Sequence, residues 1–132
     1  MPEQVRWEGR VSVKSALHTI ALMREDEIDL DSIIKTVGLT SKSGHFLDDL
    51  SQGMRQRLSL ACALIGNPKV LVMDEPLNGL DPLAQRAFCN LLKDLAKKGV
   101  AVVISSHQAV SYTHLRAHET RGNLVCRLLL EK

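Results

Sequence analysis

The spacing of apolar residues predicts three helices in the first half of the chain. Residues 32–37 predict a short helix with Asp31 as its N-cap and Gly38 just past its end. A longer helix is expected to open at residues 50–53 and to run to about residue 65, where a Gly-Asn-Pro sequence ends it. The first helix is predicted over residues 11–24, because apolar side chains recur there at helical intervals. These side chains are Val13, Ala16, Leu17, Ile20, Ala21 and Leu22.

The second half of the chain alternates short apolar runs with one helical pattern. Residues 70–73 and 100–104 are entirely apolar, as is typical of strands buried in a parallel sheet. Between them, Asp81 and Pro82 have the pattern of an N-cap followed by proline at the first helical position, and Gly99 ends the helix. We therefore predict an α/β fold in which a right-handed βαβ unit follows a helical region.

Composition narrows the class of protein only moderately. A chain of 132 residues with 45% apolar and 24% charged residues is typical of a folded domain. No apolar run approaches the roughly 20 residues of a membrane-spanning helix. Three cysteines without metal-binding spacing, Cys62, Cys89 and Cys126, favour a reducing compartment. The net charge of +2 is too small to indicate nucleic-acid binding.

Polar residues follow both predicted strands. Asp74 and Glu75 come directly after the first strand, and Ser105, Ser106 and His107 come directly after the second. Ligands of open α/β sheets bind at the carboxyl ends of the strands. Adjacent acids at such a place suit a magnesium nucleotide, since one can hold the ion and the other can orient or deprotonate a water. An acidic loop and an ordinary loop histidine are the alternatives.

A second candidate site lies at the start of the third helix. Ser51, Gln52 and Gly53 combine a hydroxyl, free backbone N–H groups and a residue without a side chain. Together with the helix dipole, these groups suit a phosphate. The alternative is that Ser51 is a plain N-cap.

These motifs together resemble those of ATP-binding cassette (ABC) ATPases. The sequence Leu-Ser-Gln-Gly-Met-Arg-Gln-Arg at residues 50–57 resembles the signature motif, and residues 70–76 resemble the Walker B strand with its catalytic glutamate. Asn-Gly-Leu-Asp at residues 78–81 is similar to the D-loop, and His107 to the switch histidine. All four occur in the order and spacing of the family.

The resemblance implies roles for the residues that follow the two strands. Asp74 would serve Mg²⁺, and Glu75 would act on the attacking water. His107 would contact the γ-phosphate of ATP. Asp81 would couple the two nucleotide sites of a dimer.

The resemblance also implies nucleotide contacts elsewhere in the chain. Ser51 and Gly53 would contact the γ-phosphate of ATP held by the opposite subunit, with Gln52 standing where the family more often has glycine. Residues 1–4 followed by residues 11–13 resemble the Q-loop and the start of the helical subdomain. Glu3 or Gln4 would be the Q-loop residue, and the register favours Glu3.

The family implies that ATP and Mg²⁺ are sandwiched between two ATPase subunits, in a homodimer or heterodimer, and that hydrolysis drives a transmembrane permease. The subunit would be cytoplasmic and peripheral on the inner face of the membrane, with no nucleic acid as partner. Residues 47–80 are most similar to exporters of drug or antibiotic type. A non-transport ABC ATPase of DNA repair or translation and a non-catalytic pseudogene product are the alternatives.

The 132 residues contain no Gly-x-x-x-x-Gly-Lys-Ser/Thr loop for the phosphates. We therefore expect a partial, incomplete P-loop NTPase fold that extends from the Q-loop to the switch histidine, and a fragment inactive by itself. Residues 1–109 would form a partial ATPase domain, with a helical subdomain over about residues 11–65 and the Walker B part over about residues 66–109.

The C-terminal stretch, residues 110–132, has a different character. Residues 110–120 resemble the translation of a transposase sequencing adapter, and residues 123–132 resemble its flow-cell end, with room for an index between them. We expect a non-native tail. It holds four of the 17 basic and two of the 15 acidic residues, so the rest of the chain is neutral.

The alternatives for this C-terminal stretch are a metal site, a basic patch, and a strand or helix over residues 124–130. The metal site would use Tyr112, His114 and His118, and the basic patch Arg116, Arg121 and Arg127.

Overall fold

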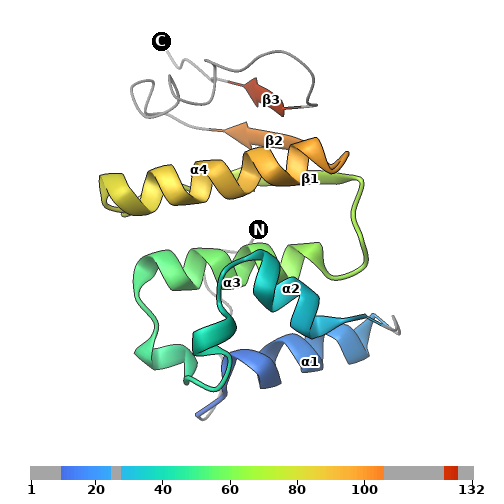
Figure 1. The fold of residues 1–132 in the computed structure, drawn as a ribbon, viewed down its shortest axis with the longest axis vertical. Helices are drawn as coiled ribbons and strands as arrows, with labels where there is room; N and C mark the ends of the chain where they lie inside the picture. The colour runs from blue at the N-terminus through green and yellow to red at the C-terminus, as the bar shows by residue number, and fades with distance from the viewer. Residues whose placement is uncertain (1–9, 25–27, 106–123, 128–132) are drawn as a thin grey trace. The chain divides into compact units, whose positions relative to one another are not determined.

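The computed structural model of the protein describes residues 10–24, 28–105 and 124–127, and the chain divides into two compact units between Pro68 and Lys69. The first unit holds helices α1 (Val13–Met23), α2 (Leu30–Thr36) and α3 (Gln52–Leu64), with the 3-10 turns η1 (Thr40–Lys42) and η2 (Leu47–Asp49). The second unit holds strand β1 (Val70–Asp74), helix α4 (Pro82–Lys97) and strands β2 (Ala101–Ser105) and β3 (Leu124–Arg127), as Figure 1 shows. No helix in these ranges has the length and apolar character needed to cross a lipid bilayer.

Helix α1 confirms the first predicted helix, although it is slightly shorter at both ends. Ser12 is its N-cap, and the Ser12 hydroxyl accepts a hydrogen bond from the Ser15 N–H at 3.2 Å. This bond satisfies one of the N–H groups that have no partner inside the helix. The predicted apolar stripe is largely buried, at Val13, Ala16, Leu17 and Ala21.

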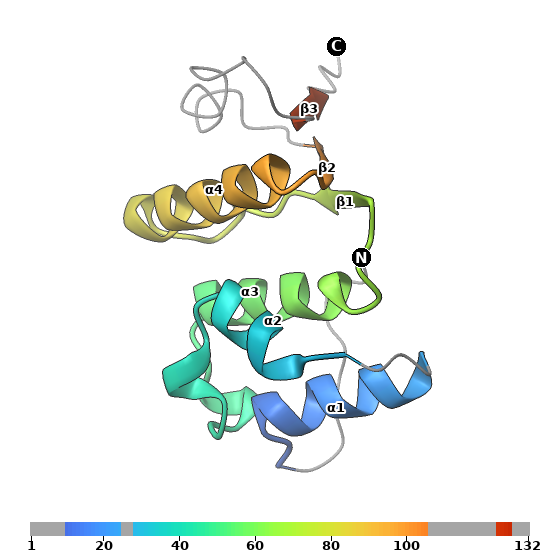
Figure 2. The same cartoon turned by 45° about the vertical axis from the view of Figure 1, so that its right-hand side comes forward.

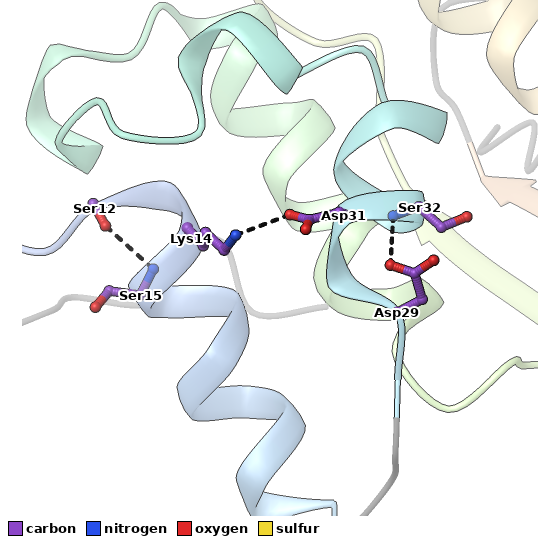
Figure 3. Close-up of polar contacts among 6 residues, drawn as sticks. All are labelled: Ser12, Lys14, Ser15, Asp29, Asp31 and Ser32. Atoms are coloured by element: carbon purple, nitrogen blue, oxygen red, sulfur yellow. Dashed lines mark hydrogen bonds and ion pairs between the residues drawn. The ribbon is translucent and has the colours of Figure 1, made fainter.

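Helix α2 begins two residues earlier than the sequence predicts, and its N-cap is Asp29 rather than Asp31. The Asp29 carboxylate accepts a hydrogen bond from the Ser32 N–H at 3.1 Å, while Lys14 Nζ donates to Asp31 Oδ1 at 3.0 Å (Figure 3). Two acids with the same capping ability stand two positions apart, so sequence alone does not choose between them. Asp31 instead lies in the first turn, where a negative charge favours the helix dipole.

The three helices of the first unit contact one another, and Figure 2 shows them grouped together. Two arginines satisfy carbonyl groups at the helix ends. Arg57 Nη1 donates to the carbonyl of Val37, the C-cap of α2, at 3.2 Å, and Arg24 Nη1 donates to the carbonyl of Ile65, the C-cap of α3, at 2.6 Å. Such carbonyls have no partner inside the helix, and positive charge is favoured there. The fully buried side chains of this unit include Leu17, Ile34, Leu39, Leu60 and Ile65.

One cysteine of the first unit, Cys62, is close enough to Arg24 for the charge of the arginine to act on its thiol. Burial raises the pKa of the Cys62 thiol to about 11, although a backbone hydrogen bond and the charge of Arg24 act in the opposite direction. Since only the thiolate is nucleophilic, Cys62 is an unreactive thiol near neutral pH.

The second unit confirms the predicted order of strand, helix and strand. β1 and β2 are parallel, with Val70 opposite Ala101 and Asp74 opposite Ser105. β3 pairs in parallel with β2, so the order of strands in the sheet is β1-β2-β3. Helix α4 connects β1 to β2 and packs against β2.

Strands β1 and β2 are fully buried on one face only, which corrects the prediction of two buried strands. Val70 and Val72 of β1 are 55% and 69% exposed. An entirely apolar run predicts a strand that is covered on both faces of the sheet. The elements that would cover the second face are not part of the run, so the run itself does not show whether they are there. The other face is nearly fully buried, at Leu71, Met73, Val102 and Ile104.

Strand β3 is the only part of the C-terminal stretch among the described residues. Residues Leu124–Arg127 form a strand, which is one of the alternatives stated for residues 124–130. The adapter-like residues 110–120, the alternative metal site and two of the three basic-patch arginines lie outside the described residues. Pairing with β2 does not depend on where the residues come from, so the non-native tail stays a prediction.

Candidate functional site

The two adjacent acids lie where the sequence places them, at the carboxyl end of β1. Asp74 is the last residue of the strand and is exposed, and Glu75 follows it half-buried. Ser105, the last residue of β2, lies opposite Asp74 in the sheet register. The Ser105 hydroxyl donates a hydrogen bond to Asp74 Oδ1. The carboxyl ends of both strands therefore bring a carboxylate and a hydroxyl into direct contact.

The backbone turns sharply at Glu75. Its φ of +44° lies in the left-handed region, which non-glycine residues rarely adopt and which is common at functional sites. Two backbone bonds fix this conformation: the Glu75 N–H donates to the Ser105 carbonyl at 3.1 Å, and the Asn78 N–H donates to the Glu75 carbonyl at 3.1 Å. The chain thus leaves the sheet at Glu75 rather than continuing along β1.

The loop that follows Glu75 is held by a side chain that sequence reasoning missed. Gln85 of α4 donates its side-chain amide to the Leu80 carbonyl at 3.1 Å and to the Leu77 carbonyl at 3.4 Å. Leu77 and Leu80 are themselves buried, and Gly79 supplies a φ of +72°. The sequence did contain a signal for Gln85. It lies four residues after the predicted N-cap, so its side chain can reach the loop that precedes the helix.

Asp81 is the N-cap of α4, as predicted. Its Oδ1 accepts hydrogen bonds from the N–H groups of Leu83 and Ala84, both at 2.9 Å, and Pro82 occupies the first helical position. The structure therefore gives Asp81 a structural role, and its coupling role stays a proposal.

We expect Asp81→Ala to lower the free energy of unfolding by about 1 kcal/mol, because two N–H groups of the first turn lose their acceptor. Urea denaturation followed by circular dichroism measures this change. Asp81→Asn, which retains a capping oxygen, is the matched control and should lose less. Equal losses in the two variants would contradict the capping role.

Ser51 is likewise an N-cap, so the plain structural interpretation of this serine holds. Its hydroxyl accepts a hydrogen bond from the Met54 N–H at 3.3 Å. Ser51 and Gln52 are exposed, and Gly53 is half-buried. The first turn of α3 therefore presents backbone N–H groups and a hydroxyl at the surface, which is the arrangement that binds anions at helix N-termini. This arrangement is compatible with the phosphate contact that the sequence predicts.

Three predicted site residues lie outside the described residues. They are Glu3 and Gln4 of the predicted Q-loop and the switch histidine His107. Their predicted roles are untested by this structure.

The donor set at the end of β1 fits magnesium. In the described part of the chain, no three His, Cys, Asp or Glu side chains form a group that could hold a metal by themselves. Mg²⁺ does not require such a cage, since it is usually held by one or two carboxylates together with substrate phosphates and waters. An exposed Asp74 carboxylate, oriented by a hydroxyl, is suited to that kind of site.

Comparison with known proteins identifies the family. Residues 19–111 match the family model described as "AAA domain, putative AbiEii toxin, Type IV TA system". The chain belongs to this family of AAA-type ATPase domains.

The similar curated proteins are ATP-binding proteins of ABC transporters. The chain is 47% identical over 79 residues to the ABC transporter ATP-binding protein YhcH of Bacillus subtilis, covering 59% of this chain and 26% of YhcH. It is 39% identical over 84 residues to the Nod factor export ATP-binding protein I of Rhizobium leguminosarum bv. viciae, covering 64% and 27%. The chain thus spans about a quarter of the length of these relatives.

A solved structure supports the same conclusion for the fold. CbiO1 of Clostridium perfringens, part of the ABC transporter complex CbiONQ, superposes with a TM-score of 0.64 at 26% identity, covering 76% of this chain and 42% of CbiO1. The mixed helical and parallel-sheet architecture is that of the ABC ATPase form of the P-loop NTPase fold. The family resemblance drawn from the sequence motifs is confirmed.

Proposed function

We propose that this chain is part of the ATP-binding subunit of an ABC transporter, in which ATP binding and hydrolysis between two subunits power export. The observation that carries the proposal is the pair Asp74 and Glu75 at the carboxyl end of β1, with Ser105 of β2 against Asp74. Similarity to a Nod factor export protein supports the direction of transport. A drug or antibiotic-type cargo is the finer proposal from residues 47–80.

At the end of β1, Asp74 would hold Mg²⁺ directly or through water. The metal would neutralise charge on the phosphates during transfer. Glu75 would orient the attacking water and accept its proton. The turn at Glu75 supports this division of roles, because it takes Glu75 out of the regular alternation of the strand that Asp74 still follows.

The remaining residues would complete the nucleotide contacts. Ser51, Gln52 and Gly53 at the start of α3 would contact the γ-phosphate of ATP held by the opposite subunit. Asp81 would couple the two sites, and His107 would contact the γ-phosphate. The Q-loop residue would be Glu3 or Gln4.

The partners follow from the same proposal. A second ATPase subunit would complete the dimer, and a transmembrane permease would anchor it to the cytoplasmic face of the membrane. Similarity to CbiO1, which is part of a transporter complex, supports a membrane partner. Nucleic acid is not among the proposed partners.

The proposal makes opposite predictions for the chain alone and for a completed cassette. Because the 132 residues lack the lysine-bearing phosphate loop, the purified chain should show no ATP turnover. A chimera in which residues 10–109 replace the corresponding segment of YhcH, whose remaining residues would supply that loop, should hydrolyse ATP. If the chain alone hydrolyses ATP and Glu75→Gln abolishes that turnover, the expected inactivity is wrong. If the chimera folds but does not hydrolyse ATP, the proposed function is wrong.

We also propose that residues 110–132 are a non-native tail derived from adapter DNA. Two separate stretches match the adapter, with a gap of index length between them, and this double match supports the proposal. Residues of such an origin carry no function of the protein. The nucleotide sequence behind codons 110–132 decides this question. Codons that differ from the adapter would end the proposal.

A further inference from the structure

Ser105 contacts both acids of the candidate site, through two different groups. Its hydroxyl donates to the carboxylate of Asp74, and its carbonyl accepts from the N–H of Glu75 at 3.1 Å. The contact with Asp74 follows from the sheet register, because directly paired residues of neighbouring strands present their side chains on the same face. One residue of β2 is therefore tied to both acids that end β1.

The hydroxyl bond has a clear physical effect on Asp74. An exposed aspartate samples several side-chain rotamers, and a hydrogen bond to its charged carboxylate selects one of them. The bond occupies Oδ1, and each carboxylate oxygen has two acceptor sites, so Oδ2 keeps its full capacity for a ligand. A fixed carboxylate also loses less conformational entropy when it binds a cation.

The carbonyl bond acts on Glu75. A left-handed φ at a glutamate costs free energy and persists only where neighbouring groups hold it. The Ser105 carbonyl supplies one of the two backbone bonds on either side of that residue. Its contribution comes from the backbone, so it survives a change of the Ser105 side chain, and only the bond to Asp74 depends on the hydroxyl.

We propose that Ser105 is a positioning residue of the hydrolysis site, whose hydroxyl fixes the carboxylate of Asp74 for a divalent cation. The cation part of this proposal rests on the proposed function. The orienting part concerns the folded chain alone and is testable without a nucleotide.

The orienting part is tested by NMR on the complete 132-residue chain. Three-bond couplings to the β protons of Asp74 should show a single rotamer in the wild type and in Ser105→Thr, which keeps the hydroxyl. Ser105→Ala should give averaged couplings. Val103→Ala, on the same strand and face but with a side chain that cannot donate a hydrogen bond, is the control for lost packing and should leave the couplings unchanged. Single-rotamer couplings in Ser105→Ala would overturn the proposal. If Ser105→Ala fails to fold, Ser105→Val, which also has no donor, replaces it.

The cation part is tested by titration of the same proteins with Mn²⁺, which broadens the amide signals near its binding site. Ser105→Ala should weaken Mn²⁺ binding by about tenfold, the usual effect of removing a partner of a metal ligand. Ser105→Thr should bind as the wild type does, and Asp74→Asn should not bind.

The Mn²⁺ outcomes separate the two proposals. If Asp74→Asn binds Mn²⁺ like the wild type, or if the wild type does not bind, the cation part is wrong. The metal role in the proposed function includes the phosphates of ATP, so it is judged separately, by the ATP turnover of the chimera. If Asp74→Asn loses binding while Ser105→Ala keeps it, only the role of Ser105 is wrong.

Discussion

Replacing Glu75 by glutamine should lower ATP turnover of the chimera with YhcH by at least about 100-fold, the usual contribution of a general base. The variant keeps the size and polarity of the side chain but cannot accept the proton of the attacking water. Turnover under saturating Mg²⁺ and ATP, followed by phosphate release, measures the effect. ATP binding should be retained, because Glu75 acts on water and not on the nucleotide.

Asp94→Asn is the matched control for this substitution. Asp94 is an exposed acid of α4 whose carboxylate pairs with Lys97 at 3.4 Å on the helix surface, and an exposed pair of this kind contributes little. Turnover of Asp94→Asn should equal that of the chimera. A Glu75→Gln chimera that hydrolyses ATP at an undiminished rate would remove Glu75 from the chemistry.

Phe88→Ala should have the largest effect on stability, with a loss of about 3–5 kcal/mol. Phe88 is a large side chain of α4, only 1% exposed, and its removal leaves a cavity in the second unit. A loss of this size is a large part of the total stability of a typical domain, about 5–15 kcal/mol. Urea unfolding monitored by circular dichroism measures it.

Leu83→Ala on the same helix controls for helix propensity, since Leu83 is 78% exposed. Its effect should stay within about 0.5 kcal/mol, as is usual for surface positions. A loss for Phe88→Ala as small as that of Leu83→Ala would mean that α4 does not form the core of its unit.

The sequence predicted much of the local structure, because the signals were local. The cap of α4 is an example, since Asp81 followed by Pro82 specifies a helix start within two residues. The cap of α2 was predicted wrongly because Asp29 and Asp31 offer the same capping chemistry two positions apart, and the sequence holds no local signal that separates them.

In the candidate site, too, the residues with local sequence signals were predicted, and the contact between residues far apart in the sequence was missed. Asp74 and Glu75 were predicted from a strand followed by acids, and the structure places both at the end of β1. The partner of Asp74 was not predicted, because Ser105 lies 31 positions away and only the strand register brings the two together. The left-handed conformation of Glu75 was also not predicted, since nothing in a glutamate favours it.

The central claim is that residues of this chain form half of an ATP sandwich between two subunits and that Glu75 acts only on the water. The Glu75→Gln chimera tests it most directly, through its molecular mass in solution by light scattering with and without Mg²⁺ and ATP. ATP held between two subunits, and not hydrolysed, should convert a monomer into a dimer, and Ser51→Arg should prevent the conversion. A chimera that binds ATP but stays monomeric at every nucleotide concentration would contradict the account.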